Sequence, residues 1–194
     1  MRLADDRFPQ VEVRSEDELR DWLGAHHDRD EAVWLVTWKK VVPERYVSTQ
    51  QILDQLVAHG WCDGIRRRLD HERVMQLVSP RRTQPWAQSY KDRAERLLAE
   101  GRMHPAGAAS VARAKASGAW EAQRDVDALL VPDDLTAALA AHPPAAQEFA
   151  GFPPSTRRNV LRWIASAKRP ETRERRVRLT ATEAQQGRRV ASNG

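Results

Sequence analysis

Residues 60–82 read "GWCDGIRRRLDHERVMQLVSPRR", and this segment predicts the central part of a β-sheet. The segment through Val74, Gln76 and Val78 alternates well enough for a β-strand, which Pro80 ends. Earlier in the stretch, Asp63-Gly64 is a turn dipeptide, after which the chain runs on as a second strand. We therefore expect a β-hairpin whose own turn lies near residues 69–72.

The segments before this stretch predict the rest of a small sheet. Residues 8–13 suit a short strand, and residues 31–40 are dense enough in β-branched and aromatic side chains for a largely buried one. Two amphipathic helices are expected over 15–26 and 47–60, each beginning with a serine or threonine that can cap it. With the hairpin, these strands make a mostly antiparallel sheet.

The sequence after residue 88 is typical of helices. Ser89 and Ser155 are expected N-caps for two of them. The expected helical segments are 89–101, 104–118, 133–142, 144–152, 153–167 and 171–187.

The predicted fold class is therefore α+β, with a sheet and flanking helices in the N-terminal half and a helical C-terminal half. We expect an α+β part over 1–95, a helical part packed on it over 96–185, and a disordered tail over 186–194.

Composition limits the class of protein. The chain has 194 residues, of which 41% are hydrophobic and 30% charged. No apolar run approaches the roughly 18 residues of a transmembrane helix, and the first residues do not resemble a secretory signal. Cys62 is the single cysteine, so an internal disulfide is excluded. We expect a cytoplasmic protein without membrane association.

Positive charge is concentrated in two blocks. Residues 61–93 hold eight basic and four acidic side chains, and residues 151–194 hold 11 and three. The other two regions, residues 1–60 and 94–150, are net acidic. Basic blocks of this kind attract phosphates, carboxylates, nucleic acid or acidic proteins, although a solvated helix face has the same composition.

The usual signatures of enzymes and metal proteins are missing. The sequence contains no glycine-rich nucleotide loop, no G-x-S-x-G and no paired ligand spacing for a metal, so we expect neither a cofactor nor a metal. Cys62 near His59 and Asp63 invites a nucleophile hypothesis. A cysteine beside a tryptophan is more often a small buried apolar residue, which is the interpretation we favour.

One candidate site surrounds the hairpin. Arginines on a strand alternate between its faces, so at least one should point inward, where Asp63 and Asp70 could pair with it in a purely structural network. The functional alternative is a site for an anionic ligand flanked by indole rings. Its members are Trp61, Asp63, Arg66, Arg68, Arg81, Arg82 and Trp86.

A second candidate site is "SAKRPETRERR", residues 166–176. Lys168, Arg169 and Arg173 lie beside a predicted helix start, where backbone N–H groups and the helix dipole favour an anion. The alternative is ordinary pairing along the helix, such as Glu171 with Arg175. The residues alone leave both interpretations open.

The ordered motifs resemble a known family. "VWLVTWKK", "GWCDGIRRRLD", "SPRR…W", "RLLAEGRMHPAG" and "RWIASAKRPETRERR" are similar to the YdeI/OmpD-associated family, over about residues 30–189. The resemblance implies a two-part α+β protein linked to bacteriocin protection or to an outer-membrane porin. It carries over no catalytic residues.

Our leading functional hypothesis is a stress-protection protein that binds an anionic small molecule or an acidic peptide. The arginines and tryptophans of the hairpin would form one wall of a cleft, and Lys168, Arg169 and Arg173 the other. An enzyme using the same cleft, with Asp63 or His59 as general base, is one alternative. Nucleic-acid binding through the basic surface is another. The sequence does not set the oligomeric state.

Overall fold

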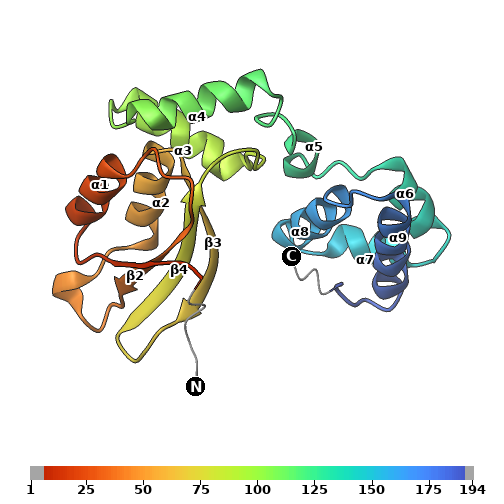
Figure 1. The fold of residues 1–194 in the computed structure, drawn as a ribbon. Coiled ribbons are helices and arrows are strands. Elements are labelled where there is room, and N and C mark those ends of the chain that lie inside the picture. Colours follow the sequence, from red (N-terminus) through yellow and green to blue (C-terminus); the bar gives the residue numbers. More distant parts are fainter. Residues whose placement is uncertain (1–6, 191–194) are drawn as a thin grey trace. The chain divides into compact units, whose positions relative to one another are not determined.

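The computed structural model describes residues 7–190, and the chain forms two compact units, Met1–Glu121 and Ala122–Gly194 (Figure 1). The first unit holds a four-stranded sheet with helices, and the described part of the second unit is helical, which confirms the predicted α+β class. The boundary between units falls later than the expected one at residue 95. The predicted tail over 186–194 extends beyond the described residues.

The sheet has the strand order β1-β2-β4-β3. Its strands are β1 (Gln10–Glu12), β2 (Val33–Trp38), β3 (Trp61–Arg68) and β4 (Arg73–Pro80). β1 is parallel to β2, and the other pairs are antiparallel. The hairpin predicted from residues 60–82 is thus confirmed, and β3 is left at an edge of the sheet.

Asp63-Gly64 does not form the predicted turn. Both residues lie inside β3, where the register with β4 shifts between Asp63 and Arg66 as in a β-bulge. A Cβ atom on Gly64 would come within 3.2 Å of the Leu77 carbonyl oxygen, so glycine relieves crowding against the partner strand here. The reversal before β3 occurs instead at Gly60, whose φ is +75°.

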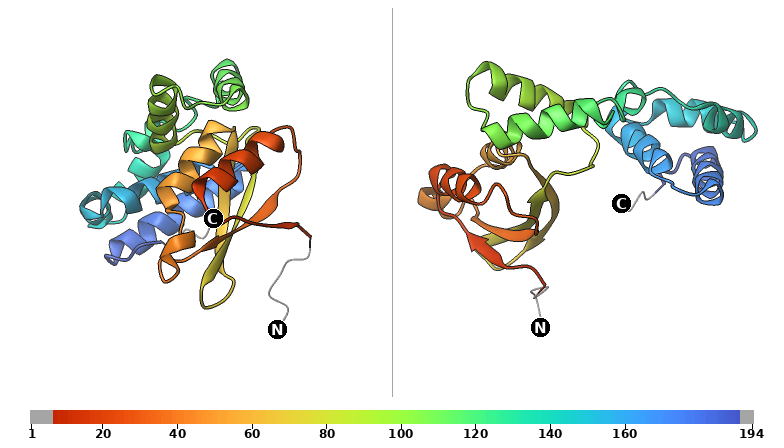
Figure 2. Two further views of the ribbon diagram at one scale, coloured as in Figure 1. Left: turned by 90° about the vertical axis from the view of Figure 1, so that its left-hand side faces the viewer. Right: turned by 45° about the horizontal axis from the view of Figure 1, so that its top comes forward.

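Two helices cover one face of the sheet (Figures 1 and 2). α1 (Glu16–Ala25) is capped by Ser15, and α2 (Thr49–Ala58) begins with a capping box between Ser48 and Gln51. A short 3₁₀ helix, η1 (Pro43–Arg45), precedes α2. Alternate residues of β2, one residue each of β3 and β4, and the inner faces of both helices contribute to one core cluster, which includes Leu19, Leu23, Val33, Leu35, Ile52, Leu56, Trp61 and Val78.

α3 (Gln88–Ala99) and α4 (Pro105–Ala116) pack against the C-terminal end of α2 through a second core cluster. The predicted Ser89 cap is wrong, because the helix begins earlier and Ala87 occupies the cap position without a side-chain hydrogen bond. A Cβ atom on Gly107 would lie 2.0 Å from the Ala58 carbonyl oxygen. Glycine is therefore what lets α4 approach the end of α2.

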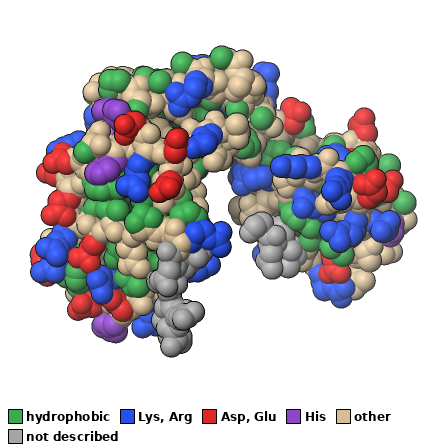
Figure 3. Space-filling view, in the orientation of Figure 1, with side chains coloured by type: hydrophobic (Ala, Val, Ile, Leu, Met, Phe, Trp, Pro, Cys, Tyr) green, Lys and Arg blue, Asp and Glu red, His purple; other side chains and the backbone are tan. Residues whose placement is uncertain are grey.

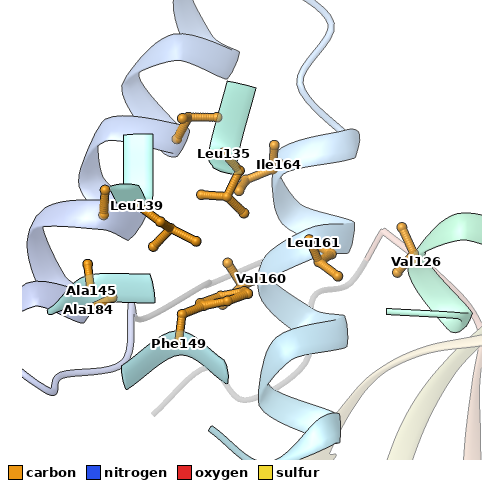
Figure 4. Packing of buried hydrophobic residues seen from close by; sticks show 11 residues of the cluster. Val126, Leu135, Leu139, Ala145, Phe149, Val160, Leu161, Ile164 and Ala184 are labelled. Atoms are coloured by element: carbon orange, nitrogen blue, oxygen red, sulfur yellow. The ribbon is translucent and has the colours of Figure 1, made fainter. Parts of the chain in front are cut away.

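The second unit consists of α5 (Arg124–Asp127), α6 (Asp133–Ala140), α7 (Ala145–Gly151), α8 (Pro154–Ala165) and α9 (Pro170–Gln185). The cap of α8 is Pro153, so the predicted Ser155 cap is wrong. Figure 4 shows how Leu135, Phe149 and Ile164 converge from three of these helices. Among residues 7–190, no helix combines the length and hydropathy that crossing a bilayer requires.

Candidate functional site

The structure divides the predicted site residues between the two units. Seven of them, from Trp61 to Trp86, belong to the first unit, together with His59, and Lys168, Arg169 and Arg173 belong to the second. A cleft that combines both groups stays a prediction.

Arg81 is a buried arginine at the end of β4, with 5% of its surface exposed. Its guanidinium lies over the rings of Trp86 and Tyr90, at 4.4 and 5.1 Å, and donates to the Pro85 carbonyl oxygen at 3.3 Å. In the described part of the chain no ion pair involves Arg81, and its Nε has no hydrogen-bond partner. Burial lowers the pKa of this guanidinium. The charges of nearby Cys62, Tyr90 and Asp63 raise the pKa and partly offset the effect of burial. Cation–π contacts thus replace a carboxylate partner.

Asp63 is held by two side chains. Tyr90 donates its hydroxyl to one carboxylate oxygen, and Gln76 Nε2 donates to the other at 3.1 Å. Burial, together with this hydrogen bond to Asp63, raises the pKa of the Tyr90 hydroxyl. Because each oxygen already accepts a hydrogen bond, Asp63 is poorly placed to act as a general base.

The two predicted indoles are core residues. Trp61 and Trp86 are 0% and 1% exposed, and each belongs to a hydrophobic cluster of the first unit. Cys62 is also buried, with its Sγ 3.4 Å from the Ser79 hydroxyl. These side chains supply packing within the first unit, as expected for Cys62.

The arginines of β3 are exposed. Arg66 donates to the Thr49 hydroxyl at 3.3 Å, and Arg68 donates to the backbone oxygen of Asp70 at 3.1 Å. The Asp70 carboxylate pairs instead with Arg73, at 2.7 Å. The predicted salt bridges from Asp63 and Asp70 to the arginines of β3 are therefore not formed. Asp63 accepts from Tyr90 and Gln76, and Asp70 pairs with Arg73 of β4. Outside β3, Arg82 pairs with Asp30 at 2.7 Å on the surface.

In the second unit the cations have different partners. Arg173 forms two hydrogen bonds with Asp134, at 2.7 and 3.0 Å, and these bonds lower the pKa of the Asp134 carboxyl. Lys168, Arg169 and Arg175 are exposed. Within residues 7–190 none of these three has a carboxylate oxygen within 4 Å, and the expected Glu171–Arg175 pair is not formed. Lys and Arg side chains gather on the visible face of this unit (Figure 3).

A neighbouring arginine fixes the segment that carries two of these cations. Arg176 lies over the Trp163 ring at 4.8 Å, and donates to the Trp163 carbonyl oxygen and to the Ser166 hydroxyl. It therefore joins the end of α8 to α9 on either side of Lys168 and Arg169. An anchored segment loses less conformational freedom when a ligand binds to it.

The other candidate base, His59, follows α2 and lines a cavity of about 800 Å³ in the first unit. Its Nδ1 lies 2.8 Å from the Gln55 carbonyl oxygen, and the ring stacks on His104 with 4.8 Å between centroids. Burial lowers the pKa of His59, and the charges on His104, His27 and Arg20 lower it further.

Most of the residues that line this cavity, including His104 and Arg102, were not predicted from the sequence. The position of His104 immediately before Pro105 is the one available signal, because a helix-starting proline places the preceding residue at the N-cap. Over the described residues, no three His, Cys, Asp or Glu side chains are grouped so that they could hold a metal ion.

Comparison with known families gives two separate matches. Residues 11–110 match a family described as a domain of unknown function, DUF8412, and residues 128–187 match "Bacteriocin-protection, YdeI or OmpD-Associated". Searches of curated proteins and of solved structures found no significant match. The resemblance expected over residues 30–189 is thus confirmed only for the second unit. Since the first match covers just over half of the 194 residues, the chain belongs to the DUF8412 family, and its second unit is similar to the bacteriocin-protection, YdeI or OmpD-associated proteins.

Proposed function

We propose that this protein binds an anionic partner, and that Lys168, Arg169 and Arg175 make the principal contacts. The observation that carries the proposal is that these three exposed cations have no carboxylate within 4 Å among the described residues. The ordinary alternative, pairing of Glu171 with Arg175, is absent there. A cation without an internal partner keeps its charge available for a phosphate or carboxylate.

The contrast with Arg173, Arg176 and Arg188 supports this choice. Arg173 and Arg188 pair with Asp134 and Glu183, so their charges are already compensated. Arg176 is engaged with the end of α8. The partner would therefore meet the segment between α8 and α9, which belongs to the part of the chain that matches the bacteriocin-protection family.

Thermal unfolding with a panel of anions tests the proposal. The probes are inorganic pyrophosphate, hexaglutamate and a short DNA duplex, each at about 50 and about 200 mM salt, which separates local from purely electrostatic binding. We expect stabilisation by pyrophosphate or hexaglutamate that is lost when Lys168, Arg169 and Arg175 are all replaced by Ala. Arg188→Ala is the matched control, because it removes a charge that Glu183 already compensates.

Each other outcome argues against this assignment. If no anion raises the melting temperature, the protein is not an anion binder of this kind. Stabilisation by DNA alone, falling steeply with salt, would favour the nucleic-acid alternative. Stabilisation that survives in the triple variant would place the site elsewhere, and Arg66→Ala/Arg68→Ala then tests the wall predicted on β3.

Protection against a bacteriocin is the biological role that we propose for this binding, because the description of the matching family names it. The test is survival of a sensitive bacterium that expresses the wild-type chain or the triple variant during bacteriocin challenge. Equal survival of both strains would show that protection does not depend on the three cations.

An enzyme remains the second candidate, and one observation favours it. His59 keeps Nε2 without a hydrogen-bond partner among the described residues, whereas both oxygens of Asp63 are occupied. His59 is therefore the better of the two predicted bases. Turnover of a cavity ligand that is lost in His59→Gln would support catalysis, and unchanged turnover in that variant would exclude His59 as the base.

A further inference from the structure

The cavity beside His59 lies in the first unit and is separate from the cations of the proposed function. Its walls come from α1, from the end of α2, and from the segment that leads into α4. Its volume of about 800 Å³ falls in the range typical of small-molecule sites. The residues that line it are Glu16, Asp17, Arg20, Asp21, Gly24, Gln55, His59, Gly101, Arg102, Met103, His104 and Pro105.

Backbone contacts fix opposite tautomers in the two stacked imidazoles. The Nδ1 atom of His59 lies 2.8 Å from the Gln55 carbonyl oxygen, which only accepts, so Nδ1 carries the hydrogen. The Nδ1 atom of His104 accepts the backbone N–H of Ala106 at 3.2 Å, so the hydrogen of this neutral ring is on Nε2. His59 Nε2 is therefore an acceptor, and His104 Nε2–H is a donor.

Neither Nε2 atom has a hydrogen-bond partner in the described part of the protein. His59 is only 5% exposed, and a Cβ atom built on the cavity-lining Gly24 would lie 4.0 Å from its Nε2. His59 Nε2 is not among the fully buried side-chain atoms that lack a partner, so this acceptor is open to the cavity, where a ligand or water can satisfy it.

The charged groups around the cavity are already compensated. Glu16 accepts from Gln51 and Gln55 at 2.8 and 2.7 Å, and lies 3.6 Å from Arg102. Arg20 pairs with Asp17 at 2.8 Å and lies 3.5 Å from Asp21. Because each lining carboxylate and guanidinium has an ionic partner, the cavity favours a neutral ligand over a charged one. The flat Arg102 guanidinium and the Met103 thioether provide surfaces on which a planar ring can pack.

From this arrangement we propose that the cavity binds a neutral planar molecule through an amide edge, as found in a lactam or a nucleobase. The N–H of the ligand donates to His59 Nε2, and its carbonyl oxygen accepts from His104 Nε2–H. The two rings stack with their planes 24° apart and their centroids 4.8 Å apart, and both residues line the cavity, so one ligand can contact both imidazoles.

NMR of the imidazole nitrogens tests the premise and the binding together. In the free protein near pH 7.5, we expect His59 protonated on Nδ1 and His104 on Nε2. Titration with uracil should shift both imidazoles, whereas 1,3-dimethyluracil, which lacks N–H donors, should not. The reverse tautomers, equal shifts with both compounds, or no shift with uracil would overturn the proposal. Glucose serves as a non-planar probe, and imidazole shifts caused by glucose but not by uracil would also overturn it.

A second test fills the cavity with a larger side chain. Gly24→Leu introduces a side chain beside His59 Nε2 on a helix that tolerates leucine, so the melting temperature should not fall, while the affinity for uracil falls at least tenfold. Gly151→Leu is the matched control, because a Cβ atom there meets nothing within 4 Å. Unchanged affinity in folded Gly24→Leu would contradict the site. Anion binding by the second unit should be unaffected in either variant.

Discussion

The two units use their charged residues differently. In the first unit, Asp54 is 9% exposed and lies between Arg93 and Arg96, with its Oδ1 2.6 Å from Arg96 Nη2. In the second unit, Lys168 and Arg169 are exposed and have no acidic partner among the described residues. Basic residues can therefore form buried ion pairs that stabilise the fold in one unit and remain available for binding on the surface of the other.

The largest effect should come from breaking the buried pairing. Asp54→Asn leaves Arg93, which has only 14% of its side chain exposed, without its carboxylate. We expect a loss of about 3 kcal/mol in the free energy of unfolding, because a buried charge remains unpaired. Urea denaturation measures this loss.

The corresponding change in the second unit is Asp134→Asn. There the Arg173–Asp134 pair has side chains 36% and 43% exposed, and water can replace the lost partner. The expected loss is at most about 1 kcal/mol. Similar losses of unfolding free energy for Asp54→Asn and Asp134→Asn would contradict the difference that we infer between the ion pairs of the two units.

An effect between those of Asp54→Asn and Asp134→Asn should follow from crowding the contact between α4 and the end of α2. Gly107→Ala places a methyl group where 2.0 Å separates Cβ from the Ala58 oxygen, so α4 must move away from α2. We expect a loss of about 2 kcal/mol, measured by urea denaturation. Gly151→Ala meets no atom within 4 Å and should be nearly neutral, and a neutral Gly107→Ala would contradict the tight contact.

The stability of the first unit should also depend on pH through His59. Its folded-state pKa is lowered below the ordinary value of about 6.5, so the unfolded chain takes up the proton first as the pH falls. The free energy of unfolding should therefore decrease below about pH 6.5, and level off below the folded-state pKa. Burial, His104, His27 and Arg20 disfavour the proton, and only the Gln55 carbonyl favours it.

Urea denaturation at about pH 7.5 and about pH 5 measures this dependence. His104, whose pKa is lowered by burial and by His27, contributes with the same sign. His59→Gln should be less stable at both pH values but lose less stability between them than the wild type. An unchanged difference in that variant would assign the pH dependence to other groups.

The sequence predicted the elements better than their exact starts. Hydrophobic alternation and turn residues identified the hairpin, because those patterns reflect local backbone preferences. They misassigned Asp63-Gly64, whose role in a bulge depends on crowding by Leu77 of the partner strand. The Ser89 and Ser155 caps failed for a similar reason, since each helix begins before its serine.

The candidate site was less predictable because it depends on tertiary contacts. Lys168 and Arg169 could be found from a local run of charge, but whether Glu171 would pair with Arg175 could not. His59 and His104 are 45 positions apart, and they meet only because Gly107 lets α4 approach the end of α2. No local pattern encodes that approach.

The smallest effect on stability should come from the residues proposed to bind. Replacing Lys168, Arg169 and Arg175 by Ala removes three exposed cations that have no acidic partner within residues 7–190. We expect a change of at most about 0.5 kcal/mol in the free energy of unfolding, because no internal interaction of their charges is lost. Mutual repulsion among these cations can even make the variant slightly more stable. A loss of several kcal/mol by urea denaturation would show that the cations support the fold. The cations of the second unit would then stabilise the fold as those around Asp54 do in the first unit. Their availability for binding an anion would no longer follow.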